Sequence, residues 1–299
     1  MTNYLTSKIF SKLSVLNERP TTPVLTEPTN PFTFDQNLDF HLNDGIGSLP
    51  MPSDIVGSSW SGGVLAPNGK IYAAPQTGQP GVLEIDPSGS GSVREISITG
   101  DISSSSFAGA VLAPNGKIYA PPLGGDNVLE IDPSGSVSTR LLPIPNYETG
   151  SSWPGGVLAP DGKIHCIPFV GSNILIIDPS DSPIITTSAM PTQVSTTRYY
   201  GSVLGPDGKI YGIPFDGTDL KVVVLDTTDN SSTTIPIPAT TPVANWVGGV
   251  LGPDGKIYGI PFAGHNVLVI DTSTGDITTI PAGVSGWGWF GGVLGPNGK

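Results

Sequence analysis

Residues 62–70 read GGVLAPNGK, and residues 71–75 continue as IYAAP. Both runs are rich in residues that suit the pleated, half-buried surface of a β-strand. Asn68-Gly69 lies between them, and Asn-Gly supplies the positive φ angles that a two-residue hairpin turn requires. The stretch therefore predicts a β-hairpin of two antiparallel strands.

The hairpin recurs along the chain. Its first half occurs six times, as GGVLAPNGK, GAVLAPNGK, GGVLAPDGK, GSVLGPDGK, GGVLGPDGK and GGVLGPNGK, closing at Lys70, Lys117, Lys163, Lys209, Lys256 and Lys299. These lysines are 47, 46, 46, 47 and 43 residues apart. A third apolar run, such as VLEID at 82–86, and a weaker fourth, such as DITTIPA at 276–282, follow the first five hairpins. Four short antiparallel strands that repeat about every 46 residues are typical of β-propeller blades.

The number of repeats indicates six blades. Residues 31–52 align loosely with the third and fourth runs at 261–282 and would supply a sixth outer pair. We therefore expect residues 31–299 to form an all-β, six-bladed β-propeller with four-stranded blades. The last blade would be shared between the N- and C-termini, with 287–296 as its inner strand, which would remove an exposed sheet edge. The chain stops at Lys299, before a second strand of that blade, so a truncated hairpin is the alternative.

Residues 1–30 depart from the repeat. A short amphipathic helix is expected within 4–16, and the Pro- and Thr-rich residues 18–31 predict an extended linker. We expect this N-terminal arm to dock on a larger assembly or to pack across the propeller, and an unused tail is the alternative. Lys8 and Lys12 interrupt the apolar region, so no secretory signal peptide is predicted.

Charge and composition narrow the range of partners. The net charge of −12 repels phosphate backbones and anionic membranes, so we expect no nucleic-acid partner. No apolar run reaches the roughly 18 residues of a membrane-spanning helix. The single cysteine, Cys166, excludes an intrachain disulfide framework. The compartment stays open between a virion or cell-surface assembly and the cytoplasm.

The repeated G-P-[ND]-G-K-[IL]-Y element resembles the blades of NHL-type, gluconolactonase-type and streptogramin-lyase-type propellers, over roughly residues 31–299. The near-identical VLAPNGKIY repeats are also similar to those of some viral and phage-borne proteins of unassigned role. Resemblance to the gluconolactonase type implies metal-binding Glu, Asp and Asn at the channel mouth. Resemblance to the streptogramin lyases implies His and Glu near the channel.

The first strands lack these groups. They should line the central channel, yet they carry no acid, histidine or amide before the turn, so we predict no catalytic residue, metal site or cofactor. His41, His165 and His265 fall at non-equivalent blade positions without metal-ligand spacing, and we expect them to be tolerated substitutions. Cys166, beside His165, is expected to be a buried structural thiol.

Charged residues also repeat. One aspartate ends each third run and is expected to cap the turn that follows, at Asp86, Asp132, Asp178, Asp226 and Asp271. Glu84 and Glu130 are expected to face solvent. The lysines that follow the turns are expected to act as edge solubilisers, and a basic ring that meets an anionic partner is the alternative.

An aromatic residue precedes every first strand, at Trp60, Phe107, Trp153, Tyr199, Trp246 and Trp289. The loops expected on the same face carry asparagines in G-x-N patterns, Asn127, Asn173 and Asn266, with Phe169, Phe215 and Phe262 just before some of them. An aromatic ring beside an amide suits a sugar ring or an extended peptide. The six aromatics that precede the first strands and the three asparagines are therefore the predicted binding residues. The alternative is that the aromatics wedge between neighbouring blades as core.

Blade similarity favours a non-enzymatic protein, since enzymes place unlike residues on particular blades whereas multivalent binders repeat one site. We expect a recognition or structural propeller, on a virion or cell surface, that presents a repeated glycan- or protein-binding face. The alternative is a lyase- or lactonase-type enzyme with a site built from the irregular loops at 73–81, 181–199 and 216–221. A purely structural spacer is a third possibility.

Overall fold

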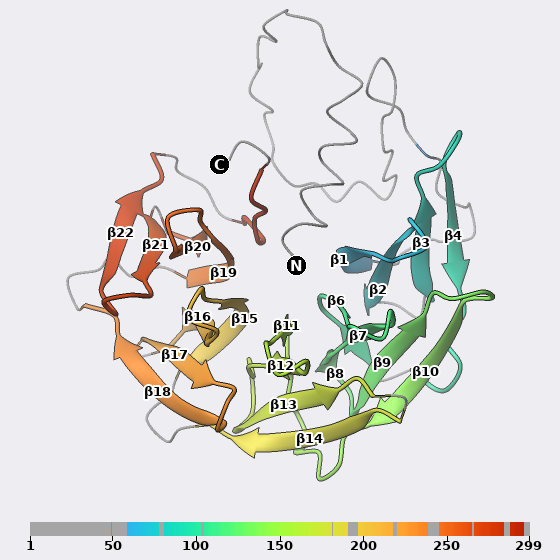
Figure 1. Ribbon diagram of the computed structural model, residues 1–299, viewed down its shortest axis with the longest axis horizontal. Helices are drawn as coiled ribbons and strands as arrows, with labels where there is room; N and C mark the ends of the chain where they lie inside the picture. Colours follow the sequence, from blue (N-terminus) through green and yellow to red (C-terminus); the bar gives the residue numbers. More distant parts are fainter. Residues whose placement is uncertain are drawn as a thin grey trace, which may run out of the picture.

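The computed structural model describes residue 49 and residues 59–77, 81–102, 105–180, 182–190, 197–217, 220–238, 245–264, 266–283 and 288–295. The sheets in these ranges succeed one another around a common axis, with the first strand of each blade innermost (Figure 1). Neighbouring strands within a blade pair antiparallel. The predicted all-β propeller with four-stranded blades is therefore confirmed.

The five blades share one strand order. Blade 1 comprises β1 (Ser59–Leu65), β2 (Ile71–Thr77), β3 (Val82–Asp86) and β4 (Ser92–Ile96). Blade 3 comprises β11 (Val157–Leu158), β12 (Ile164–Cys166), β13 (Asn173–Asp178) and β14 (Ile184–Ala189). Blade 4 comprises β15 (Arg198–Leu204), β16 (Ile210–Asp216), β17 (Lys221–Asp226) and β18 (Ser231–Pro236). Blade 5 comprises β19 (Asn245–Leu251), β20 (Lys256–Ala263), β21 (Asn266–Asp271) and β22 (Ile277–Pro281).

In blade 2 the two inner strands are interrupted. The first strand is split into β5 (Ser106–Phe107) and β6 (Val111–Leu112), and the second into β7 (Ile118–Ala120) and β8 (Pro122–Gly124). β5 pairs with β8, and β6 pairs with β7, so the two halves keep the hairpin arrangement of the other blades. The outer strands are β9 (Asn127–Asp132) and β10 (Ser138–Pro143).

The prediction of six blades was wrong for the described chain, which forms five. Residues 288–295, the expected inner strand of a sixth blade, are described but form no strand. They lie against blade 5, where the Gly291 amide donates to the Val247 carbonyl at 3.1 Å. A blade needs a second strand for pairing, and none in the described ranges lies beside this segment. Apart from Leu49, residues 31–52 fall outside the described residues, as do residues 1–30.

A row of glycines lines the axis and explains the first glycine of each GGVL motif. Gly62 has a φ of +65°, in the left-handed region that favours glycine, and the first strand bulges here between Ser61 and Val64. A Cβ placed on Gly62 would lie 3.2 Å from the Cα of Gly109, its equivalent in the next blade. The same close approach joins Gly109 to Gly155, Gly201 to Gly248 and Gly248 to Gly291. The segment at 288–295 thus continues the glycine row.

The apolar core is divided into four clusters, each at the junction of two neighbouring blades. One aromatic that precedes a first strand belongs to each cluster: Phe107, Trp153, Tyr199 and Trp246. Blades splay apart with distance from the axis, and large side chains at these junctions fill the space and exclude water.

Candidate functional site

Four of the six predicted binding aromatics are buried. Phe107, Trp153, Tyr199 and Trp246 expose no more than 1% of their surface, whereas Trp60 and Trp289, at the two ends of the row, are partly exposed. The arrangement of the four is the one foreseen by the alternative, in which the rings wedge between blades. A contribution of the six rings to ligand binding stays a prediction.

The predicted nearness of aromatic and asparagine is present, but through the backbone. The indole N–H of Trp153 donates to the carbonyl of Asn173 at 2.9 Å, and that of Trp246 donates to the carbonyl of Asn266 at the same distance. A buried indole nitrogen needs such a partner. The bond ties the first strand of a blade to the start of its third strand. The side chains of Asn127, Asn173 and Asn266 are partly exposed, and a role for them in binding stays a prediction.

A second set of rings, which we name the aromatic cluster, lies on the face where the first strands of the blades begin and the second strands end. It consists of Phe169, Tyr200, Phe215, Phe262 and Phe290. Phe169, Phe215 and Phe262 follow Ile-Pro at equivalent positions of blades 3, 4 and 5. The ring centroids of Phe169 and Phe215 lie 5.5 Å apart, those of Phe215 and Phe262 also 5.5 Å, and those of Phe262 and Phe290 5.1 Å. The three repeats thus bring their phenylalanines into one continuous row.

Tyr200 closes this row into a cluster. Its ring centroid lies 5.7 Å from that of Phe169, 5.9 Å from Phe215 and 6.4 Å from Phe290. Successive residues of a strand point to opposite faces, so Tyr199 enters the core while Tyr200 turns away from it. The side chain of Phe290 is 58% exposed, and the other four rings are partly buried.

The Tyr200 hydroxyl makes no hydrogen bond to another described residue. Burial of the ring raises the pKa of this phenol above its usual value, so the hydroxyl is protonated at neutral pH and can donate. A tyrosine enclosed by rings normally finds a hydrogen-bond partner for its hydroxyl. The cluster therefore combines an apolar surface with one polar group that has no hydrogen-bond partner in the described part of the chain.

An arginine forms part of the rim of the aromatic cluster. The guanidinium carbon of Arg198 lies 5.6 Å from the ring centroid of Phe169, within the range of a cation–π contact. Its Nη1 also lies 3.4 Å from Oδ2 of Asp216. Both side chains are exposed, so this ion pair contributes little to stability, and the two charges offset one another at the rim.

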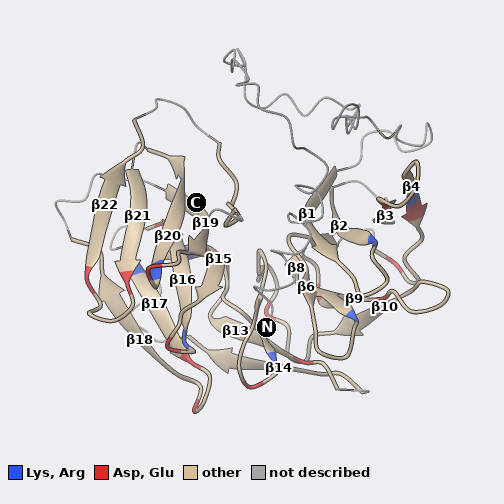
Figure 2. Cartoon of the chain, turned by 45° about the horizontal axis from the view of Figure 1, so that its top comes forward, with Lys and Arg blue, Asp and Glu red and all other residues tan. Residues whose placement is uncertain are grey.

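The opposite face, which carries the hairpin turns, is a surface of paired charges (Figure 2). In each blade the lysine after the turn contacts the aspartate that ends the third strand. The N···O distances are 3.4 Å for Lys70–Asp86, 3.5 Å for Lys117–Asp132, 3.2 Å for Lys163–Asp178, 3.3 Å for Lys209–Asp226 and 2.8 Å for Lys256–Asp271. The positive charge of each of these lysines is therefore offset by an aspartate of the same blade, which argues against a basic ring that binds an anionic partner.

The turn-capping prediction is confirmed for four of the aspartates. Oδ1 of Asp86 accepts a hydrogen bond from the backbone N–H of Ser88 at 2.9 Å. Equivalent bonds join Asp132 to Ser134, Asp226 to Thr228 and Asp271 to Ser273. These bonds, with the neighbouring lysine in each blade, lower the pKa of the four carboxyls.

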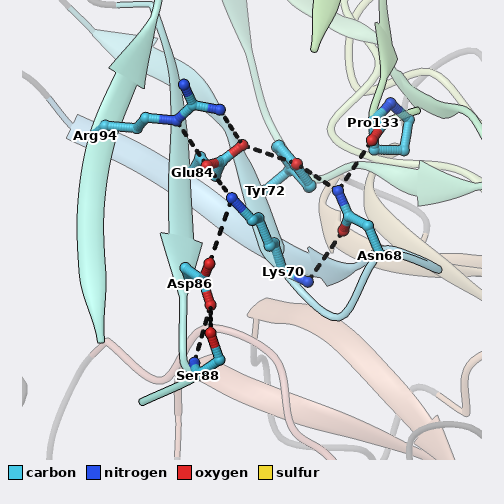
Figure 3. A network of polar contacts seen from close by, with 8 residues as sticks. All are labelled: Asn68, Lys70, Tyr72, Glu84, Asp86, Ser88, Arg94 and Pro133. Atoms are coloured by element: carbon cyan, nitrogen blue, oxygen red, sulfur yellow. Dashed lines mark hydrogen bonds and ion pairs between the residues drawn. The ribbon is translucent and has the colours of Figure 1, made fainter. Parts of the chain in front are cut away.

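The prediction that Glu84 faces solvent was wrong, because Glu84 is 2% exposed at the centre of a polar network (Figure 3). Lys70 Nζ donates to Oε1 at 2.9 Å and Tyr72 Oη to Oε2 at 2.9 Å. Arg94 donates to both oxygens, from Nε at 2.6 Å and from Nη2 at 2.9 Å. Burial alone would raise the pKa of Glu84, but the hydrogen bonds from Arg94, Lys70 and Tyr72 outweigh it and lower the pKa to about 2.

Blade 2 repeats this network around Glu130, which is likewise buried, so its prediction was wrong as well. Tyr119 Oη lies 3.1 Å from Oε2, Lys117 Nζ 3.2 Å from Oε1 and Arg140 Nη2 2.9 Å from Oε2. Arginine directly opposite glutamate across the outer strand pair is the signal that sequence reasoning missed. It marks a cross-strand ion pair that can be buried.

The hairpin turn holds an asparagine in blades 1 and 2, which contain the buried glutamate, and an aspartate in the other blades. In blade 1, Asn68 Nδ2 donates to Tyr72 Oη at 2.9 Å and to the carbonyl of Pro133 in blade 2 at 3.0 Å. Asn115 makes the equivalent pair of bonds, to Tyr119 and to Pro179 of blade 3. In blades 4 and 5 the turn holds an aspartate, and the tyrosine hydroxyl donates to it instead, as in Tyr211–Asp207 and Tyr258–Asp254.

His165 takes the place of this tyrosine in blade 3. It is fully buried, and its Nε2 lies 2.9 Å from Oδ2 of Asp161. That His165 is a tolerated substitution stays a prediction. The neighbouring Cys166 is buried as predicted, and burial raises the pKa of its thiol. His41 and His265 lie outside the described residues.

Within the described ranges, no three side chains of His, Cys, Asp or Glu gather closely enough to hold a metal ion. The same ranges contain no helix of the length and apolarity needed to cross a membrane.

Comparison of the sequence with protein-family models gave no match, and neither did comparison with curated proteins. Solved structures do share the fold. A catalytically inactive virginiamycin B lyase from Staphylococcus aureus with quinupristin superposes with a TM-score of 0.65 at 19% identity, over 79% of this chain and 74% of that chain. The periplasmic gluconolactonase of Pseudomonas aeruginosa gives 0.59 at 15% identity, over 81% and 74%. A protein from Lactobacillus plantarum gives 0.62 at 16% identity, over 79% and 74%.

The expected resemblance to streptogramin-lyase-type and gluconolactonase-type propellers is thus confirmed as a likeness of fold. Identities below 20% leave activity open, because the same fold hosts unrelated functions and a site has to be argued from its own residues.

Proposed function

We propose that this chain is a non-enzymatic recognition propeller that binds a protein or glycan ligand on the face of the aromatic cluster. The observation that carries the proposal is the cluster itself, in which five rings from three blades and the segment at 288–295 contact one another and stay partly exposed. Single exposed apolar residues are ordinary on a protein surface, whereas a contiguous apolar patch marks an interaction site.

The rings are held on a rigid support. Phe169 follows a buried proline, Phe215 belongs to β16 and Phe262 to β20. Tyr200 and Phe290 each follow one of the predicted aromatics, and Tyr199 fixes Tyr200 by its own burial in the core. Side chains that are already ordered lose little entropy when a ligand binds. Under this proposal the buried aromatics support the binding face from beneath it.

The proposed site is single and not repeated in each blade. The positions equivalent to Phe169, Phe215 and Phe262 hold Gln76 in blade 1 and Leu123 in blade 2. The aromatic surface is therefore confined to blades 3 to 5 and the adjoining segment. We expect one ligand per chain, measurable as the stoichiometry of an isothermal titration.

A ligand screen tests the proposal. The protein is exposed to peptides and glycans, and each compound that raises its Tm is recovered and analysed by mass spectrometry. A ligand that binds, returns chemically unchanged and no longer binds to Phe290→Ser supports recognition through the cluster. Binding that is unaffected by Phe290→Ser and by Phe215→Ser would place the site elsewhere.

The proposal also assigns a role to the N-terminal arm, residues 1–30. We propose that residues 1–30 dock on a larger assembly, on a virion or cell surface, while the propeller face stays free for the ligand. Deletion of residues 1–30 is then expected to abolish incorporation of the protein into that larger assembly and to leave the Kd for the ligand unchanged. A truncated protein that still co-assembles would contradict this part.

The second candidate is an enzyme of lyase or lactonase type, favoured by the enzymes among the structures of similar fold. Its site would be built from the loops at 73–81, 181–199 and 216–221, of which the last two include the rim residues Arg198 and Asp216. Incubation with quinupristin and with gluconolactone, followed by mass spectrometry, tests this candidate. Turnover that is lost in Arg198→Ala would replace the binding proposal by the enzymatic one.

A further inference from the structure

We infer that the aromatic cluster takes an apolar side chain, aromatic or branched, presented by a peptide whose backbone carbonyl accepts a hydrogen bond from Tyr200. The inference rests on the proposed function, since it names the ligand class of the same site. Three properties of the cluster carry it: the tilt of its rings, the open hydroxyl of Tyr200 and the charge around it.

The rings are tilted against one another and do not form a flat platform. The interplanar angles are 63° for Phe169–Phe215, 45° for Phe215–Phe262 and 68° for Phe262–Phe290. Tyr200 meets Phe169 at 75°. A pyranose stacks its apolar face on the open face of one ring, whereas a compact side chain can meet several tilted rings at once, edge against face. The tilted arrangement therefore favours an apolar side chain over a sugar.

The polar groups of the site are few. Among the described residues of the cluster, the Tyr200 hydroxyl is the one side-chain hydrogen-bonding group, and the rim adds the Arg198–Asp216 pair. A sugar presents many hydroxyls, each of which loses water on binding and needs a partner. A peptide presents a carbonyl beside every side chain, and the protonated Tyr200 is a donor for one such acceptor. A mostly apolar site with one orienting polar group fits a peptide side chain and its backbone.

Charge limits the flanks of the peptide. Arg198 and Asp216 offset one another at the rim, while the whole chain carries a net charge of −12. This overall field repels strongly acidic peptides, attracts basic ones and does not oppose the approach of neutral ones. The expected ligand is therefore an aromatic or branched apolar residue with neutral or basic neighbours.

In the experiment, four forms of the full chain are used to pan a randomised peptide library and to probe a glycan array. These are the wild type, Phe290→Ser, Tyr200→Phe and the control Gln76→Ala, which changes the position equivalent to the cluster phenylalanines in blade 1. Phe290 is largely exposed, so its replacement leaves the fold in place, and equal Tm values check this. Titration of the enriched sequences gives their Kd values.

We expect enrichment of peptides that carry Phe, Tyr, Trp, Leu or Ile without acidic neighbours. Phe290→Ser should weaken them at least about tenfold, Tyr200→Phe roughly fivefold through the lost hydrogen bond, and Gln76→Ala should leave them unchanged. Peptides that bind Tyr200→Phe as well as the wild type would overturn the orienting role of the hydroxyl. Glycans that bind the wild type and lose binding in Phe290→Ser would overturn the peptide inference while the proposed function stands. Absence of any cluster-dependent binder in both libraries would overturn the proposed function itself.

Discussion

Glu84 and Arg94 face each other across β3 and β4, and Arg94 Nε lies 2.6 Å from Glu84 Oε1. Directly opposite residues at the same position of the other blades are Glu130 with Arg140, Ile176 with Thr186, Val224 with Thr233 and Val269 with Thr278. The glutamate and the arginine are thus present together or absent together in the five described blades. Blades 3 to 5 form without this ion pair, so the residues at the same position in these blades show which replacements a blade can accept in blades 1 and 2.

Removal of the arginine alone should destabilise blade 1. Arg94→Thr leaves Glu84 buried with only Lys70 and Tyr72 as partners, and a buried charge that loses a hydrogen-bonded partner costs about 1–3 kcal/mol. The double variant Glu84→Val/Arg94→Thr copies the Val224–Thr233 pair of blade 4 and should recover most of the loss. Urea unfolding measures both free energies. A double variant no more stable than the single one would contradict the reading of the pair as one unit.

The turn residue should be coupled to the same pair. Asn68→Asp in the wild type loses the donor to the Pro133 carbonyl and sets a second carboxylate near Glu84, so we expect a loss of roughly 1–2 kcal/mol. In the Glu84→Val/Arg94→Thr background the new aspartate can accept from Tyr72, as Asp207 accepts from Tyr211, and the loss should be smaller. A double-mutant cycle from urea unfolding measures this coupling. Equal losses in the two backgrounds would show that the turn and the pair are independent.

Acid should weaken the wild type more than the double variant. The pKa of Glu84 is about 2 in the fold against an ordinary value of 4.5, so the fold favours the ionised carboxylate. Its contribution to stability is complete above the ordinary pKa and is lost as the pH falls from about 4.5 to about 2. Tm measured across this range should fall more steeply for the wild type than for Glu84→Val/Arg94→Thr. Parallel curves would assign the acid sensitivity to other carboxylates.

The glycine row allows backbone strain to be separated from crowding. Gly62→Ala would combine a φ of +65° with a Cβ that lies 3.2 Å from the Gly109 Cα, whereas Gly69→Ala has a φ of +82° and no neighbour within 4 Å. The left-handed conformation costs an L-residue roughly 1–2 kcal/mol at either position. We expect Gly62→Ala to lower the free energy of unfolding beyond that of Gly69→Ala, because the contact between blades must open. Equal losses would mean that the blades can move apart at Gly62 and Gly109 without lowering the free energy of unfolding.

The architecture was predictable from sequence wherever the signal was local and repeated. The hairpin around Asn68-Gly69, the four strands per blade and the turn-capping role of Asp86 follow from residues close together in the chain. The turn type was predicted wrongly, because Gly69 has a positive φ and Asn68 does not. The blade count failed because residues 288–295 form no strand, so the sixth copy of the GGVL motif does not begin a sixth blade in the described part of the chain. The position of Glu84 failed because alternation along one strand does not show Arg94 opposite it on the next.

The aromatic cluster was not predicted, although its members were visible. Phe169, Phe215 and Phe262 stand 46 and 47 residues apart, and their contact exists only once the blades are placed around an axis. The doublets Tyr199-Tyr200 and Trp289-Phe290 were the available signal, since strand alternation sends one ring of each pair inward and the other outward. The aromatics that precede each first strand are more conspicuous in the repeat, and four of them, Phe107, Trp153, Tyr199 and Trp246, are buried in the core.

Core and binding roles of the aromatics should separate in a matched pair of variants. Trp246→Phe keeps a ring in the junction of blades 4 and 5 but loses the indole hydrogen bond to the Asn266 carbonyl and leaves a void. It should lower the free energy of unfolding by about 1–3 kcal/mol and leave ligand affinity unchanged. Phe290→Ser, at a ring that is 58% exposed, should do the reverse. Urea unfolding and titration of both proteins with the same ligand give the four values. If Trp246→Phe weakened binding at unchanged stability, the buried aromatics would have to be restored to the binding site.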